Sequence, residues 1–242
     1  HRLNTMTIEY FCMHCRPNVG ADIHLEQQDV RQVDVLLTEA GLIPTGDIEA
    51  KLQALSALAQ RRGAAVRISA TLRPGRKEYQ NFGLLAALDI VEAIRDVVIR
   101  FDVDPNDIYL IGSSYGGYLA NLATKLFPGA VKAVFDNSSW ASPHLSYIVG
   151  RELGTPEYLH EILPGVVMGL HVLSPWTLKS GLPNSFDHEK ATIRSFSEEQ
   201  IEQMAIQGGT GTAYVFFHAA NDRIADVREK IVMAKTMIKQ GF

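Results

Sequence analysis

Residues 112–116 read Gly-Ser-Ser-Tyr-Gly and place a serine between two glycines. The apolar residues 108–111 before it predict a short strand. After it, apolar residues recur at helical spacing within 115–126, which predicts a helix. A strand, a tight turn and a helix in this order present a serine hydroxyl at a strained position, where the glycines let strand and helix approach. A free serine hydroxyl is a weak nucleophile, so such a site also needs a base. We predict that Ser114 is a nucleophile that forms an acyl-enzyme. The neighbouring Ser113 is the alternative, but the spacing of the two glycines favours Ser114.

The residue after the serine is placed to stabilise a transition state. The backbone N–H of Tyr115 begins the predicted helix, so we expect it to donate to the oxyanion that forms during attack. A second donor normally comes from an earlier loop, but the sequence has no His-Gly-Gly segment, and we expect that donor outside it. The alternative is a phosphate-binding turn. Against it, the segment lacks the lysine of a Walker loop and the third glycine of a dinucleotide fingerprint.

The acid that orients the base is expected in a loop after a later strand. Residues 214–217 predict that strand, and Asp222 follows it closely. Its carboxylate would orient an imidazole and stabilise the cation that forms during proton transfer. Two alternatives stay open at this point. Asp222 could cap the next helix, or the acid could be Asp136, which follows the predicted strand 131–135.

The base is expected last, after the acid and one further strand. The sequence ends at Phe242, directly after a predicted helix, so we expect the catalytic histidine beyond Phe242 and little turnover by this chain alone. His218 is the nearest alternative, but we expect its side chain to point along the end of its strand and not to bridge to Ser114. The other histidines are more typical of surface or packing residues than of a catalytic base: His144, His160, His171 and His188.

Helical and strand patterns alternate along most of the chain. Strands are predicted at 7–13, 64–70, 108–111, 131–135 and 213–217, and helices at 47–62, 80–100, 115–126 and 224–240. Strand, helix and strand in this order favour parallel crossover connections. The sequence therefore predicts an α/β protein with the α/β-hydrolase fold, a mostly parallel sheet flanked by helices and truncated at both ends.

The stretch from about 138 to 209 differs from the rest. It holds five prolines, both tryptophans and only short apolar pieces. We predict a helical insertion or cap within a single domain, 1–242. For Trp140 and Trp176 two roles stay open, the lining of a substrate pocket and packing in the core.

The composition is that of a globular protein without strong net charge. Of 242 residues, 46% are hydrophobic and the formal net charge is −4, so no strong field attracts nucleic acid. The chain also has no apolar run of 18 residues. We expect a small-molecule or peptide acyl substrate, with neither nucleic acid nor membrane as a partner. Cys12 and Cys15 are too few for a zinc site, so we expect no metal and no cofactor, and their lack of a disulfide framework suggests the cytoplasm.

Several segments together resemble one bacterial family. Residues 78–83, 87–90, 112–120 and 136–139 are similar to the family called domain of unknown function 2920. The resemblance implies an α/β hydrolase related to the prolyl oligopeptidase group. Residues 218–222 are also similar to the His-Gly-x-x-Asp segment of that group, whose Asp is the triad acid, which implies this role for Asp222. Ala219 replaces the glycine. The resemblance implies no particular substrate.

Taken together, these features predict a serine hydrolase that cleaves an ester, thioester or amide. A small carboxylesterase or deacetylase is the first choice, and a peptidase is the second. An acyltransferase would use the same serine, with an alcohol or sugar in place of water. A non-catalytic binding module of the same fold is the third hypothesis, and it would lack the histidine.

Overall fold

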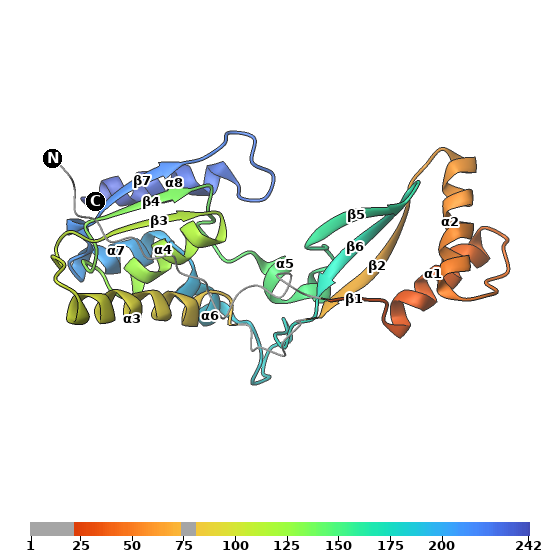
Figure 1. Cartoon of the computed structure of the whole chain (residues 1–242), viewed down its shortest axis with the longest axis horizontal. Helices are drawn as coiled ribbons and strands as arrows, with labels where there is room; N and C mark the ends of the chain where they lie inside the picture. The colour runs from red at the N-terminus through yellow and green to blue at the C-terminus, as the bar shows by residue number, and fades with distance from the viewer. Residues whose placement is uncertain (1–21, 74–80) are drawn as a thin grey trace. The chain divides into compact units, whose positions relative to one another are not determined.

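The computed structural model describes residues 22–73 and 81–242, which divide into two compact units (Figure 1). Among the described residues, the first unit consists of Asn81–Pro143 and Asp187–Phe242. The second consists of 22–73 and 144–186. Each unit is therefore assembled from two segments that are far apart in the sequence.

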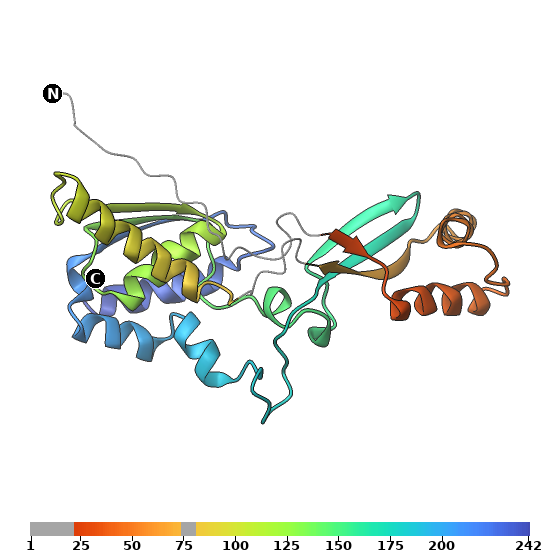
Figure 2. The same cartoon turned by 60° about the horizontal axis from the view of Figure 1, so that its bottom comes forward.

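A parallel three-stranded sheet forms the centre of the first unit. Its strands run in the order β3 (Tyr109–Ser113), β4 (Ala133–Asn137), β7 (Ala213–Phe217). The helices of this unit are α3 (Leu84–Arg100), α4 (Tyr115–Leu126), α6 (His188–Arg194), α7 (Glu198–Ile206) and α8 (Val227–Lys239), with a short 3-10 helix at Gly209–Gly211. Figure 2 shows the strands of this unit with α7 and α8, in blue, below them.

The two faces of this sheet differ in what covers them. Leu110, Val134 and Tyr214 come from the three strands and pack in one apolar cluster with Ala120 of α4. Alternate residues of a strand point to opposite faces. On the other face, Ile111 is 84% exposed, and Tyr109 and Phe217 are exposed as well. Within the described residues, this apolar cluster therefore lies on the α4 side of the sheet.

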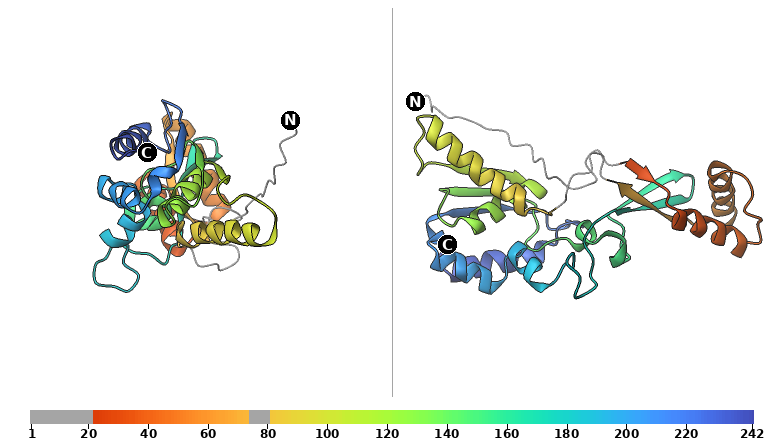
Figure 3. Two further views of the ribbon diagram at one scale, coloured as in Figure 1. Left: turned by 90° about the vertical axis from the view of Figure 1, so that its left-hand side faces the viewer. Right: turned by 90° about the horizontal axis from the view of Figure 1, so that it is seen from below.

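A mixed four-stranded sheet forms the second unit. Its order is β1 (Asp22–His24), β2 (Val66–Arg73), β6 (Val166–Val172), β5 (Tyr158–Leu163). The central pair β2 and β6 is parallel, and both outer strands are antiparallel to their neighbours. Helices α1 (Gln27–Glu39) and α2 (Ile48–Arg62) supply Val33, Leu37 and Leu55 to its core, and they appear in red and orange in Figure 3. Helix α5 (Leu145–Ile148) and a 3-10 helix at Gly150–Leu153 complete the unit.

Capping residues set several helix boundaries. The Asp47 side chain accepts a hydrogen bond from the Ala50 N–H at the start of α2, and Gly63, with φ of 61°, ends it. A left-handed residue at this position favours glycine because glycine has no Cβ. Ser197 caps α7 in the same way as Asp47 caps α2. None of the described helices is both long enough and apolar enough to cross a membrane.

The predicted α/β class and parallel sheet are confirmed, and most predicted elements coincide with observed ones within a few residues. Helix α1 was not predicted, because its first turn is polar. Its Glu26 and Asp29 form a capping box, and Val33 and Leu37 carry its buried face. The predicted strand 7–13 and both cysteines, Cys12 and Cys15, lie outside the described residues.

The predicted helical insertion at about 138–209 has a different structure. Residues 144–186 belong to the second unit and contain the hairpin of β5 and β6, whereas 187–209 belong to the first unit and are mainly helical. The run Val166–Val172 is buried and pairs with β2, about 100 residues earlier in the chain. The prolines on either side obscured this strand, because only its distant partner makes it part of a sheet. The stretch thus contributes to both compact units, and the single domain 1–242 stays a prediction.

Candidate active site

Ser114 occupies the turn between β3 and α4 in a strained backbone conformation. Its φ is 53° and its ψ is −122°, values rare for a residue with a side chain. Such a conformation costs about 1–3 kcal/mol and persists only where surrounding structure enforces it. Here the Ser114 N–H donates to the Asn137 carbonyl (2.7 Å), and its own carbonyl accepts from the Tyr118 N–H (3.1 Å). The turn is therefore held from both the neighbouring strand and the helix.

Two glycines make this turn possible, and only one of them, Gly112, is among the two glycines of the motif. A Cβ on Gly112 would overlap the Gly116 carbonyl oxygen. A Cβ on Gly117 would lie 2.5 Å from Asp136 Oδ1 and 3.0 Å from the Ser139 Cβ. A Cβ on Gly116 would meet nothing within 4 Å. Close approach of α4 to the sheet thus depends on Gly112 and Gly117.

Tyr115 begins α4 directly after the serine. Its backbone N–H belongs to the first turn of the helix, where N–H groups have no acceptor within the helix. The ring of Tyr115 lies 6.1 Å from that of Tyr118 and 6.3 Å from that of Trp140. Tyr115 therefore combines an N–H beside the serine with a ring in an aromatic cluster.

A second strained serine lies at the end of the neighbouring strand. Ser138 follows β4 with φ of 56°, and its N–H donates to the Phe217 carbonyl of β7 (2.8 Å). Beside it, the Asn137 side chain donates to the Ser113 hydroxyl (3.1 Å). Nothing in the spacing of the sequence marks Ser138. Strain thus occurs at the carboxyl ends of two adjacent parallel strands.

Asp222 lies in the loop after β7, at the same edge of the sheet as Ser114. Its Oδ1 accepts from the N–H groups of Ile224 (2.8 Å) and Ala225 (3.0 Å). Its side chain is 17% exposed, and Oδ2 lies 3.7 Å from His218 Nε2. The hydrogen bond from Ala225, together with that from Ile224 and the charge of His218, lowers the pKa of this carboxyl below its ordinary value. The next helix, α8, is capped by Asp226.

Asp136, the alternative acid, is buried in an ion pair. Its side chain is 1% exposed, and Oδ2 lies 2.8 Å from Lys230 Nζ of α8. The same oxygen accepts from Asn121 (2.7 Å) and the Ser139 hydroxyl (2.7 Å), and Oδ1 accepts from the Ser139 N–H (3.1 Å). These contacts occupy the carboxylate and link β4, α4 and α8. Sequence reasoning missed Lys230, which lies on the buried face of a helix where a lysine is unusual.

None of the histidines in residues 22–73 and 81–242 hydrogen-bonds to the Ser114 hydroxyl. His218 Nε2 lies 2.9 Å from the Ala225 carbonyl, so its ring is directed at the loop that carries Asp222. His171 is buried in the second unit, where desolvation, together with the charge of Arg151, lowers its pKa. His144 stacks on Tyr147.

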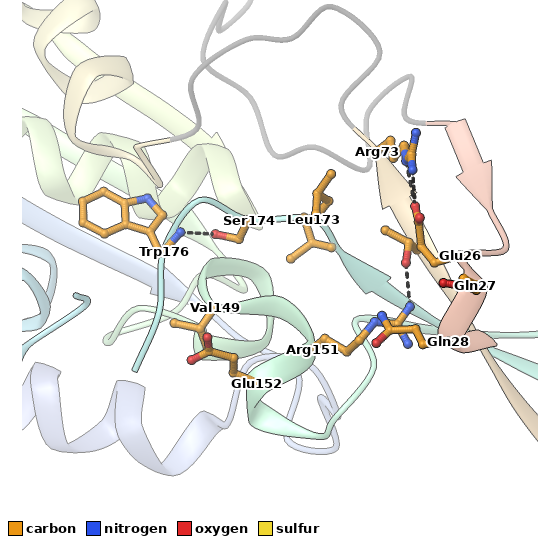
Figure 4. Close-up of a pocket in the computed structure, with 12 residues that line it drawn as sticks. Glu26, Gln27, Gln28, Arg73, Val149, Arg151, Glu152, Leu173, Ser174 and Trp176 are labelled. Atoms are coloured by element: carbon orange, nitrogen blue, oxygen red, sulfur yellow. Dashed lines mark hydrogen bonds and ion pairs between the residues drawn. The ribbon is translucent and has the colours of Figure 1, made fainter. Parts of the chain in front are cut away.

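The two tryptophans belong to different units and have different surroundings. Trp140 is 7% exposed and packs beside Tyr115 and Tyr118 in the first unit. Trp176 lines a cavity of about 460 Å³ in the second unit, at the carboxyl ends of β2 and β6 (Figure 4). Both arginines on this cavity are already paired, Arg73 with Glu26 and Arg151 with Asp29. The cavity contains none of the predicted catalytic residues.

Comparison with known proteins gives one match over the full chain. The model of the family described as "Protein of unknown function (DUF2920)" matches residues 1–242. A comparison with curated proteins gives no match.

Two solved structures are similar over part of their length. The acylaminoacyl peptidase of Pyrococcus horikoshii is 14% identical with a TM-score of 0.41, over 66% of this chain and 22% of the peptidase. The esterase domain of a Rhodothermus marinus protein is 16% identical with a TM-score of 0.33, over 92% of this chain and 76% of that domain. The chain thus spans less than a quarter of the peptidase, and similarity at these TM-scores assigns neither fold nor activity.

Proposed function

The chain belongs to the DUF2920 family, and we propose that it is a serine hydrolase of the α/β-hydrolase fold with Ser114 as its nucleophile. One observation carries the proposal, the strained backbone of Ser114 at the turn between a parallel strand and a helix. Strain of this kind is concentrated at functional sites, because neighbouring structure must stabilise it. Here the turn leaves a hydroxyl at the carboxyl edge of the sheet, where ligands of α/β proteins bind.

The proposed reaction proceeds through an acyl-enzyme. A base takes the Ser114 hydroxyl proton while the oxygen attacks a carbonyl carbon, and the carbonyl oxygen becomes an oxyanion. The Tyr115 N–H then donates to this oxyanion. Removal of one such donor typically costs about 3 kcal/mol of transition-state stabilisation. The leaving group departs with the proton from the base, and water hydrolyses the ester on Ser114.

Asp222 is the proposed acid. Two backbone N–H groups hold Oδ1, while Oδ2 lies 3.7 Å from His218 Nε2 in a side chain that is 17% exposed. The lowered pKa supports an ionised carboxylate at neutral pH, as an acid that stabilises an imidazolium requires. The ion pair with Lys230 and its further hydrogen bonds argue against Asp136 in this role.

The proposed base is a histidine that accepts the proton of the Ser114 hydroxyl with one ring nitrogen and donates to the Asp222 carboxylate with the other. His218 fits this role poorly, because its Nε2 is engaged with the Ala225 carbonyl. The proposed substrates are esters, thioesters or amides with a small-molecule or peptide acyl group.

Labelling with a fluorophosphonate probe tests the nucleophile. Its phosphorus forms a bond to an activated serine oxygen and releases fluoride, so the label marks the nucleophile. In the full-length protein we expect one label on the peptide that contains Ser114, and its loss in Ser114→Ala. Ser113→Ala is the matched control and should keep most of the labelling. A label that survives Ser114→Ala, or a wild-type protein that takes no label, would refute the proposal.

A further inference from the structure

We propose that Trp140 is a positioning residue that holds the loop of Asp222 against the nucleophile helix α4. The inference rests on the proposed function, because it assigns a role relative to Ser114 and Asp222. It adds a residue that acts through α4 and the loop of Asp222 and is not itself assigned a chemical step. The partners described below, Tyr115, Tyr118, Ser139, Ile224 and Lys230, all belong to the first unit.

On one side, Trp140 binds the loop that carries the acid. Its indole N–H donates to the Ile224 carbonyl at 3.1 Å. The N–H of the same residue, Ile224, donates to Asp222 Oδ1 at 2.8 Å. The Ile224 carbonyl belongs to the peptide unit whose N–H, that of Ala225, also donates to Asp222 Oδ1 at 3.0 Å. The indole thus binds one of the two peptide units that hold the carboxylate, and the connection bridges 84 residues of sequence.

On the other side, Trp140 packs against the start of α4. Its ring meets that of Tyr115 at 6.3 Å and 60°, and that of Tyr118 at 6.4 Å and 73°. Both are edge-to-face arrangements, which aromatic rings favour because of their quadrupoles. Tyr115 directly follows Ser114 in the chain, so the ring of Trp140 packs against the residue next to the proposed nucleophile.

The backbone of Trp140 is also held in place. Its carbonyl accepts from Lys230 Nζ (3.4 Å) and from the Ser139 hydroxyl (3.4 Å). Lys230 is itself paired with Asp136 at 2.8 Å in a buried position. A side chain that is 7% exposed and anchored at both ends has little freedom to move. Trp140 can therefore transmit the position of α4 to the loop of Asp222.

The variant Trp140→Phe tests this role in the full-length protein. Phenylalanine keeps an aromatic ring beside Tyr115 but removes the only donor of the indole. We expect the backbone amides of Ile224 and Ala225 to exchange hydrogen about tenfold faster, as loss of one buried hydrogen bond implies. We also expect slower fluorophosphonate labelling of Ser114, by about tenfold. A less fixed carboxylate stabilises an imidazolium less, so the pH midpoint of labelling should shift downward.

Tyr118→Phe is the matched control. It removes a buried hydrogen bond from the same aromatic cluster, that of the Tyr118 hydroxyl to the Arg194 carbonyl (2.8 Å), without touching the acid loop. It should leave both the exchange of residues 222–225 and the pH midpoint unchanged. In an Asp222→Asn background, Trp140→Phe should slow labelling no further, because Trp140 acts only by positioning the carboxylate that Asp222→Asn removes.

The outcomes separate this inference from the proposed function. A wild-type protein without label at Ser114 refutes the proposed function and, with it, any catalytic role of Trp140. A labelled wild type with unchanged exchange and labelling in Trp140→Phe overturns the inference alone. Equal effects of Trp140→Phe and Tyr118→Phe, or a full additional loss in the Asp222→Asn background, would assign Trp140 a general packing role and also overturn it.

Discussion

Ser114 and Asp222 are held by different means, although they lie at the same edge of one sheet. The serine is fixed by a strained backbone whose N–H and carbonyl are both hydrogen-bonded. The aspartate has an ordinary loop position and is fixed through its side chain by two backbone N–H groups. Substitution of the aspartate therefore changes the charge with little effect on the turn of the serine.

Asp222→Asn should reduce the rate of fluorophosphonate labelling by about 10³–10⁴, because the amide favours the wrong tautomer of an adjacent imidazole. Thermal unfolding should show a small loss of stability. Since the folded pKa of Asp222 is lowered, its contribution to stability is present above the pKa of the unfolded chain and is lost as pH falls through the folded pKa. The loss in Asp222→Asn should therefore be largest at neutral pH and vanish in acid. A labelling rate within threefold of the wild type would exclude Asp222 as the acid.

At the scale of elements, contact between α4 and the sheet decides the geometry of the turn. Helix α4 approaches β3 at Gly112 and β4 at Gly117, and the buried pair of Asp136 and Lys230 holds β4 to α8. The G-x-S-x-G pattern correctly predicts a strand, a turn and a helix around Ser114. It does not identify Gly117, because a steric limit set by Asp136 depends on how the strand packs against the helix.

Gly117→Ala and Gly116→Ala form a matched pair of tests. Alanine at 117 would press against Asp136 Oδ1, in a carboxylate that Lys230 holds through Oδ2, so we expect a loss of about 1–3 kcal/mol. Alanine at 116 enters open space in a helix and should be neutral or stabilise by up to about 1 kcal/mol. Urea unfolding of both variants measures the difference. Equal stability would show that the close approach at Gly117 does not constrain the fold.

At the scale of the molecule, each compact unit joins two distant segments of the chain. In the second unit, the parallel pair β2 and β6 joins the two segments, and an ion pair between Arg151 and Asp29 joins them as well. Arg151 donates to both carboxylate oxygens of Asp29 (2.7 and 3.2 Å) and to the Thr71 hydroxyl (2.6 Å). This network links α1, β2 and the 3-10 helix at Gly150–Leu153.

Arg151→Met should destabilise the second unit in particular. Asp29 is 1% exposed, so removal of its partner leaves a buried charge unpaired, which typically costs about 3–5 kcal/mol. Hydrogen exchange should accelerate at the amides of β2 and β6 more than at those of β3 and β4. Arg100→Met is the control, since its pair with Asp96 is exposed and contributes about 0.5 kcal/mol or less. A uniform acceleration in both sheets would contradict the prediction.

The sequence by itself determined the features that depend on local order. Helical and strand periods, capping residues and the glycine-flanked serine lie within single segments, so the α/β class and the turn at Ser114 follow from the sequence alone. Only the tertiary structure decided which distant groups meet. Lys230 pairs with Asp136 across 94 residues, Trp140 binds Ile224 across 84, and β6 pairs with β2 across about 100. A hydrogen bond or ion pair has no periodic signature in the chain, because its partners become neighbours only when the elements pack.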